Sequence, residues 1–187
     1  MFVNHPGPTP VSTLRVMDGH DEIDRMLGQW SWASYDLPLE AMAVSKRIQR
    51  MSRRLEKLAA DSLGPLGLEP GEFDVLATLL RSGPPFEVTP TWLSNSLLIS
   101  AAGLTKRLVR LEDRGLVTRR MAPRDRRSLL VALSEEGRAL AEKGVAVHGA
   151  AVEEMMSALD DDARDRLAGL LRELLLSQEE TSADPSA

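Results

Sequence analysis

The stretch TPTWLSNSLLISAAGLTKRLVRLEDRGLVTRRMAPRDRRSLLVALS, residues 89–134, decides the fold of this chain. Its first part predicts two short helices, over residues 90–96 and 101–114, because apolar residues recur there at helical spacing. Thr89 and Ser100 precede these helices as N-caps, whose side-chain oxygens accept the free N–H groups of a first turn. The chain is therefore expected to turn sharply between two neighbouring helices.

The second part of the stretch predicts a small antiparallel hairpin. Gly115 suits the left-handed position at which a helix ends, where a residue with a Cβ costs about 1–2 kcal/mol. Two apolar runs follow, at 116–121 and 129–133, and are predicted to be strands. The segment 122–128 joins them as an extended, basic tip. Helix, turn, helix and hairpin, in this order, is the topology of a winged helix-turn-helix, whose second helix enters the DNA major groove.

The charge of the stretch also favours nucleic acid as the partner. Residues 104–127 hold nine basic and three acidic side chains, a net charge of +6, whereas the whole chain carries −5. A basic element on an acidic protein is typical of a phosphate-binding surface. A basic helix face alone, or an arginine-rich turn alone, is often merely solvated. The two together, in this topological order, indicate DNA binding.

A helical wheel separates the two faces of the second helix. Leu104, Leu108 and Leu111 form the inner stripe. Small residues at the start of the helix allow a close approach to base edges, and Lys106 and Arg110 can meet a phosphate or a guanine edge. The predicted DNA contacts, the hairpin included, are Ser100, Ala102, Thr105, Lys106, Val109, Arg110, Arg124, Arg126 and Arg127.

The rest of the chain is predicted to be helical, which gives a mainly α fold with a small β-hairpin. The apolar stripes over 19–33, 39–63 and 161–177 exceed what one small lobe can cover, so they mark an interface and predict a homodimer. The expected segments are a disordered tail (1–17), an extra N-terminal helix (18–37), a dimerisation helix (38–69), the winged helix-turn-helix (70–134), C-terminal dimerisation helices (135–177) and a flexible tail (178–187).

Composition narrows the class of protein further. The chain has no cysteine, which excludes disulfides, thiolate metal sites and thiol redox sensors. His5, His20 and His148 lie far apart, and no Ser-centred elbow, Gly-rich phosphate loop or His-Glu-x-x-His motif occurs, so we expect no enzyme, metal or cofactor. No signal peptide and no membrane-spanning apolar run is visible, which predicts a cytoplasmic protein.

With these elements placed, residues 38–177 resemble the MarR family of bacterial transcriptional regulators. The wing signature of that family, Asp and Arg-Arg within a strand-turn-strand, stands here as RDRRS at 124–128. The acid that the family often carries before the proline of this turn is replaced by Ala122, so a local turn contact is expected to be missing. The resemblance implies a homodimer whose first and last long helices interlock, a double-stranded operator as partner, and control by small ligands.

A narrower resemblance concerns the urate-responsive subgroup of this family. GEFDVLATLLRSGPPFEVTPTWL, residues 71–93, is similar to that subgroup, as is an extra N-terminal helix with Trp30. The resemblance implies a repressor released from a palindromic operator by a small aromatic anion such as urate, and a ligand site made of Trp30, Asp74, Arg107 and Arg119. The wheel places Arg107 beside the inner stripe, within reach of Asp74. A purely structural Asp74–Arg107 salt bridge, and Trp30 as a plain core residue, stay open at this point.

The alternative to a ligand-responsive regulator is a helical interaction module whose basic hairpin binds an acidic protein. Binding to a palindromic promoter fragment that weakens steeply with salt would separate the two functions, since released counterions make DNA affinity salt-dependent.

Overall fold

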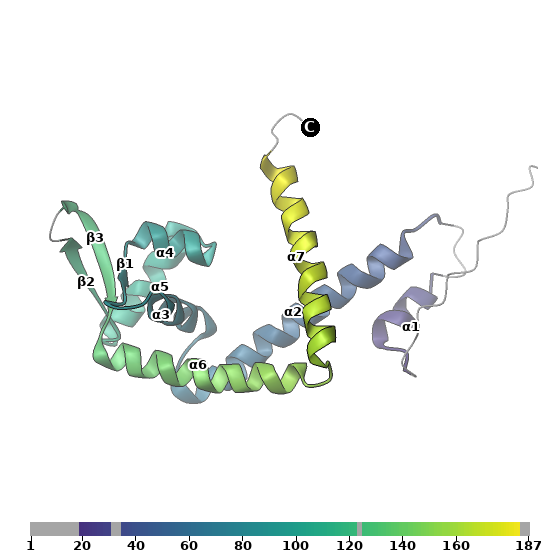
Figure 1. The fold of residues 1–187 in the computed structure, drawn as a ribbon, viewed down its shortest axis with the longest axis horizontal. Coiled ribbons are helices and arrows are strands. Elements are labelled where there is room, and N and C mark those ends of the chain that lie inside the picture. The colour runs from purple at the N-terminus through teal and green to yellow at the C-terminus, as the bar shows by residue number, and fades with distance from the viewer. Residues whose placement is uncertain (1–18, 31–34, 123–124, 184–187) are drawn as a thin grey trace, which may run out of the picture. The chain divides into compact units, whose positions relative to one another are not determined.

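The computed structural model describes residues 19–30, 35–122 and 125–183, with the backbone alone for 122, 125–128 and 179–183. The elements in chain order are α1 (Glu22–Gly28), α2 (Leu39–Leu63), the 3-10 turn η1 (Gly64–Leu66), α3 (Pro70–Arg81), β1 (Glu87–Val88), α4 (Pro90–Leu97), α5 (Ala101–Asp113), β2 (Val117–Ala122), β3 (Asp125–Leu133), α6 (Glu135–Met156) and α7 (Asp161–Ala183). The fold is mainly helical with a small antiparallel sheet, as the sequence predicted (Figure 1). No helix within the described ranges is long and apolar enough to cross a membrane.

The residues up to Arg53 and those from Arg54 onward form two compact units, and each is described by itself. In the first unit, an ion cluster holds α1 against α2. Asp21 and Asp24 form a reciprocal capping box, in which each side chain accepts the backbone N–H of the other residue, at 3.0 and 2.9 Å. Arg47 of α2 lies 3.0 and 2.7 Å from the two carboxylates. Its hydrogen bond to Asp24 holds the pKa of that carboxyl below its usual value.

α1 is shorter than the helix that the sequence predicted over 19–33. It ends at Gly28, since glycine has a low helix propensity, and Trp30 lies in the turn that follows. Trp30 is 39% exposed, and its ring meets that of Tyr35 edge-on with the centroids 6.2 Å apart. The structure therefore does not make Trp30 a core residue of this unit. Residues 31–34 lie outside the described ranges.

The second unit is built around α3, which packs against α4, α5 and α6. Fully buried leucine and valine side chains fill its core, and they are Leu63, Val75, Leu76, Leu79, Leu93, Leu104, Leu111, Val117 and Val131. Two glycines of α6 allow close packing. A Cβ at Gly144 would lie 2.9 Å from the Phe73 ring, and a Cβ at Gly137 would overlap the backbone carbonyl of Leu116. These contacts hold α6 against the helices that carry the predicted DNA surface.

The predicted starts of α4 and α5 are confirmed by their capping bonds, and α6 begins with a bond of the same kind. The side chains of Thr89, Ser100 and Ser134 each accept the backbone N–H of the residue three places on, at 3.2, 3.1 and 2.9 Å. Gly115 has a φ of +69°, the left-handed conformation expected after α5. The Ser134 hydroxyl also donates to the Gly115 carbonyl at 2.7 Å, so the start of α6 holds the end of α5. α7 continues to Ala183 rather than ending near 177, because no glycine or proline interrupts it there.

The sheet has three strands in the order β1-β3-β2, and all neighbours are antiparallel. The predicted tip over 122–128 is wrong in extent. β2 continues to Ala122 and β3 begins at Asp125, and these two residues pair after a register shift. Charged residues continue the strands because backbone pairing, rather than apolar alternation, holds a solvated hairpin together. Residues 123–124 lie outside the described ranges.

Candidate DNA interface and ligand site

The outer face of α5 is the surface that the sequence predicted to enter DNA. The inner stripe is buried as predicted, and it consists of Leu104, Leu108 and Leu111. The opposite side is exposed, and it consists of Ala102, Thr105, Lys106 and Val109. Ser100 is exposed as well, but its hydroxyl is used as the cap that accepts the Gly103 N–H. These residues share one accessible surface, and their contact with DNA stays a prediction.

The flank of α5 that faces α3 carries arginines that bind carboxylates of the same chain. Arg110 lies 2.9 Å from Glu69 and 3.8 Å from Glu72, and the next arginine, Arg114, lies 2.8 Å from Glu72. The sequence predicted Arg110 as a DNA contact, and this stays a prediction; the structure shows its side chain against α3. Its long side chain turns toward α3, because two carboxylates there compensate its charge. The Arg110 side chain, which is 41% exposed, is therefore held partly by these carboxylates.

Glu72 is the centre of this flank. Its side chain is 5% exposed, and its carboxylate also accepts the Glu69 backbone N–H at 3.3 Å. A buried carboxylate is tolerated only when it is paired, and two guanidinium groups pair this one. The sequence analysis missed the roles of Glu69, Glu72 and Arg114. The available signal was the spacing of Arg107, Arg110 and Arg114, since residues at i, i+3 and i+7 share one helix face.

The structure brings Asp74 and Arg107 together, with Oδ2 and Nη1 3.9 Å apart. This distance is long for an ion pair and the Asp74 side chain is 54% exposed, so the attraction is weak. Burial raises the pKa of the Asp74 carboxyl, while Arg107 and His148 act in the opposite direction. The Arg107 guanidinium lies over Gly71, where a Cβ would come within 2.8 Å of its central carbon. Asp74 is thus a partly buried carboxylate with a loosely held partner.

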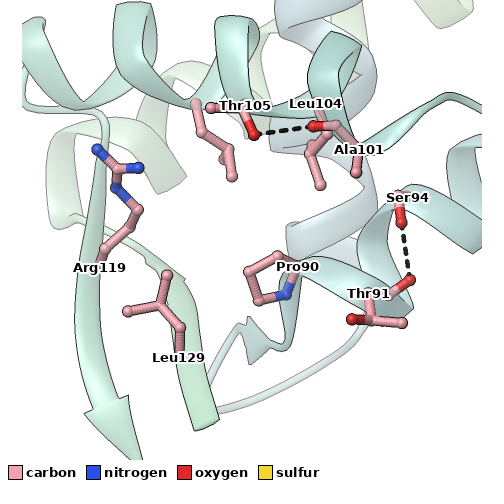
Figure 2. A pocket seen from close by; sticks show the side chains of 9 residues that line it. Pro90, Thr91, Ser94, Ala101, Leu104, Thr105, Arg119 and Leu129 are labelled. Atoms are coloured by element: carbon pink, nitrogen blue, oxygen red, sulfur yellow. Dashed lines mark hydrogen bonds between the residues drawn. The ribbon is translucent and has the colours of Figure 1, made fainter. Parts of the chain in front are cut away.

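The other flank of α5 borders a cavity of about 290 Å³. Side chains from α4, α5, β2 and β3 line it, namely Pro90, Thr91, Ser94, Ala101, Leu104, Thr105, Leu108, Arg119 and Leu129. Figure 2 shows Arg119 and Leu129 on the strands, across the space from Thr105 of α5. Arg119 is the charged member of this lining, and its Nε donates to Glu112 at 2.8 Å. This hydrogen bond lowers the pKa of Glu112 and raises the pKa of Arg119.

Arg107 and Arg119 therefore lie on different flanks of α5. Arg107 contacts α3, whereas Arg119 contacts Glu112, which is roughly 140° around the helix from Arg107 at 3.6 residues per turn. Of the predicted ligand residues, the structure joins Asp74 to Arg107 and places Arg119 elsewhere. Trp30 belongs to the other compact unit. A single ligand site made of all four residues thus stays a prediction.

The arginines of the wing are only partly described. Arg120 binds Glu87 at 2.5 Å. Arg126 and Arg127 belong to β3, with their backbone alone described, and Arg124 lies outside the described residues. Contact of these three with DNA stays a prediction. In the part of the chain that the structure describes, no group of three or more metal-ligating side chains lies together.

Comparison with known proteins shows to which family the chain belongs. The MarR family model matches residues 66–128. The HTH-type transcriptional regulator PecS of Dickeya dadantii is 33% identical over 150 residues, which cover 80% of this chain and 90% of PecS. A mutant of Escherichia coli MarR complexed with operator DNA matches with a TM-score of 0.66 and 28% identity, covering 75% of this chain and 99% of that one. Bordetella bronchiseptica BpsR, whose DNA binding is regulated by 6-hydroxynicotinic acid, matches with a TM-score of 0.63 and 25% identity, covering 70% and 91%. This chain belongs to the MarR family of winged helix-turn-helix, DNA-binding transcriptional regulators.

Proposed function

We propose that this chain is a repressor that binds a palindromic operator as a homodimer and leaves it when a small aromatic anion binds. The observation that carries the proposal is the geometry of α5, whose outer face is free while its two flanks are held by α3 and by the wing. E. coli MarR, similar in fold, has been solved with operator DNA. By analogy, α5 enters the major groove here and the hairpin follows the neighbouring backbone.

Exposed apolar side chains support the homodimer. Val44 and Ile48 of α2 are exposed, as is a leucine-rich stretch of α7 that comprises Leu167, Leu170, Leu171, Leu174, Leu175 and Leu176. Surfaces of this kind are covered in stable assemblies. Light scattering at micromolar concentration is expected to give a dimer, and Leu174→Glu is expected to give a monomer with weak operator binding. The exposed Arg172→Glu on the same helix is the matched charge control. A wild-type monomer would contradict the proposal.

The proposed operator contact is tested by mobility shift on the DNA upstream of this protein's own gene. We expect tight binding that falls steeply with salt. Arg126→Ala and Arg127→Ala are each expected to weaken binding to all sequences and to reduce the salt slope by about one for every lost phosphate contact in each subunit. Arg166→Ala on α7 is the control, because it removes an exposed charge outside the winged helix-turn-helix. Unchanged slopes in both wing variants would remove the wing from the interface.

Two features support an aromatic anion as the releasing ligand. The cavity beside α5 is lined by apolar side chains, by the hydroxyl-bearing Thr91, Ser94 and Thr105, and by the guanidinium of Arg119. A planar cation of this kind suits a carboxylate or a urate-like group. BpsR, similar in fold, is regulated by 6-hydroxynicotinic acid, an aromatic acid. On the α3 flank, a negative ligand would repel Asp74 and compete for Arg107. Because about 1.4 kcal/mol changes affinity tenfold, a modest difference in ligand affinity between the two states suffices for release.

A urate titration of the protein–operator complex, beside neutral xanthine-like analogues, tests the ligand. We expect urate to release the protein from the operator and the neutral analogues to leave it bound. Arg119→Ala and Trp30→Phe should each blunt release while leaving ligand-free DNA binding nearly intact. Leu129→Trp fills the cavity from β3 without changing the charge, so it distinguishes a ligand bound in the cavity from a ligand bound on the α3 flank. If this variant still responds fully, the anion binds on the α3 flank. No response of the wild type up to millimolar urate would remove urate as the ligand.

A further inference from the structure

The outer stripe of α5 is mainly apolar. It consists of Ala102, Lys106 and Val109 at spacing i, i+4 and i+7, which places them in one row along the helix. All three are exposed, Val109 by 40%. Lys106 is the charged member of these three, and the exposed Asp113 continues the row at the C-terminal end of the helix. The surface that α5 offers to a groove thus carries far less charge than the sequence of the helix suggests.

The arginines of α5 are turned away from this row. Arg107 lies 3.9 Å from Asp74, and Arg110 lies between Glu69 and Glu72 at 2.9 and 3.8 Å. Arginine recognises guanine by directing two donors of its planar group at O6 and N7. Arg110 would have to leave two carboxylates to do this, and its Nε is buried. Guanine reading by these side chains is therefore disfavoured in this structure.

Leu98, in the turn between α4 and α5, adds a further apolar side chain at the N-terminal end of α5, where Ala102 also lies. It has φ +52° and ψ +40°, and its side chain is 92% exposed. The left-handed conformation is unfavourable for a residue with a Cβ, and an exposed leucine gains nothing from burial. Glycine would relieve the strain, so folding does not explain a leucine here. Strained, exposed positions of this kind are often functional.

We propose that α5 reads its operator half-site chiefly through thymine methyl groups, with Ala102 and Val109 in the major groove and Leu98 at its edge. The C5 methyl of thymine is the apolar feature of the base edges in that groove. Thr105 fits the same role. Its hydroxyl donates to the Ala101 carbonyl at 2.8 Å, so its methyl group is left to contact a thymine methyl. The inference rests on α5 being the helix that enters the groove, as proposed above.

Deoxyuridine substitution tests this directly, since it removes only the methyl group. The full-length protein first selects an operator from a random duplex library, and each dT of a half-site is then replaced by deoxyuridine. We expect at least one position per half-site at which affinity falls about fourfold, the effect of one buried carbon. Equal affinity for every substituted duplex would overturn the inference. Failure to select any sequence would instead contradict the proposed operator binding.

Protein variants assign the methyl contact to a residue. Val109→Ala is expected to weaken binding to the thymine operator and to lose the discrimination against deoxyuridine at one position. Lys106→Gln, the control in the same row, should weaken both duplexes equally and reduce the salt slope. If every variant of Ala102, Val109 and Leu98 keeps full discrimination, the methyl groups are read elsewhere and the proposal is wrong.

Leu98→Gly separates binding from folding because it should lower operator affinity without lowering the stability of the fold. Relief of the left-handed strain should leave the melting temperature unchanged or raised. Affinity for the selected operator should nevertheless fall severalfold, with oligomeric state unchanged by light scattering. Retained operator affinity in this variant would remove Leu98 from the interface.

Discussion

The two flanks of α5 use their charges differently. On the α3 flank, Arg107, Arg110 and Arg114 lie against three carboxylates of α3 and its cap. On the wing flank, the single pair of Arg119 and Glu112 stands beside a cavity. The first flank ties the helix to the body of the unit, whereas the second leaves space for a small molecule. Basic residues of such a helix can therefore fix its position as well as contact DNA.

The largest expected effect comes from removing the centre of the α3 flank. Glu72→Ala leaves Arg110 and Arg114 without their buried partner. Because both arginines are partly exposed, the loss of stability should lie below that of a fully buried pair, at about 1–3 kcal/mol. Operator affinity should fall about tenfold or more, as α5 loses its fixed orientation. Urea unfolding and mobility shifts measure the two effects.

Glu69→Ala is the control for this prediction. Its carboxylate is exposed, pairs with Arg110 and belongs to the capping box of α3, so the change in stability should stay within about 1 kcal/mol. Restored operator affinity in Glu72→Asp, beside weak affinity in Glu72→Ala, would assign the effect to the ion pairs rather than to lost volume. Equal stability of Glu72→Ala and wild type would mean that the α3 flank does not fix α5.

Several features of α5 and its surroundings could be predicted from the sequence. Caps, the left-handed Gly115 and the inner leucine stripe depend on local spacing, and all were predicted correctly. The partners of Arg110 were not predicted. Its spacing with Arg107 and Arg114 indicates a shared flank of the helix, but it does not show which carboxylates a long side chain can reach. The hairpin tip was misjudged for a related reason, since backbone pairing extended β2 and β3 through charged residues.

The pairings of the candidate ligand residues could not be predicted from the sequence. Family resemblance named Asp74, Arg107 and Arg119 together, but the pairings in the structure are Asp74 with Arg107 and Glu112 with Arg119. Nothing in the spacing of these residues reveals that the body of α5 separates Arg107 from Arg119. The cavity itself arises from α4, α5 and two strands, so it exists only once these elements have packed.

A smaller effect is expected from moving an arginine on the α3 flank without removing any charge. Gly71→Ala adds a Cβ within 2.8 Å of the Arg107 guanidinium, which must shift away from α3. The flexible side chain can move, so stability should change by less than about 1 kcal/mol. Operator affinity should fall about threefold if Arg107 helps to orient α5, as measured by mobility shift. Gly149→Ala, where a Cβ meets nothing, is the control in another helix.

On the wing flank, the pH dependence of stability should follow Glu112. Its pKa is lowered in the folded state, chiefly by the hydrogen bond from Arg119. Its contribution is therefore present above the unfolded pKa and is lost as the pH falls through the folded value. The difference in melting temperature between wild type and Glu112→Gln should be largest near neutral pH and vanish in acid. A difference that does not change with pH would show that the pair adds no charge-dependent stability.

On the α3 flank, Asp74 should give the smallest effect and the opposite sign. Its pKa is raised in the folded state, because burial outweighs the attraction of Arg107 and His148. The contribution of this carboxyl to stability is thus present below its unfolded pKa and is lost as the pH rises through the folded value. Asp74→Asn should match wild type in acid and become relatively more stable toward neutral pH. Because the side chain is half exposed, the gain should stay below about 1 kcal/mol.

Urea unfolding of wild type, Asp74→Asn and Glu112→Gln between pH 3.5 and 7 measures both signs in one series. In the same variants, Asp74→Asn should weaken operator binding about twofold to threefold, since it removes the attraction on Arg107, whereas Glu112→Gln should change it less. A fall in the relative stability of Asp74→Asn with rising pH would show instead that Arg107 compensates the buried charge fully. The Asp74–Arg107 contact would then be a fixed structural ion pair, and a ligand could displace it only at a much larger cost.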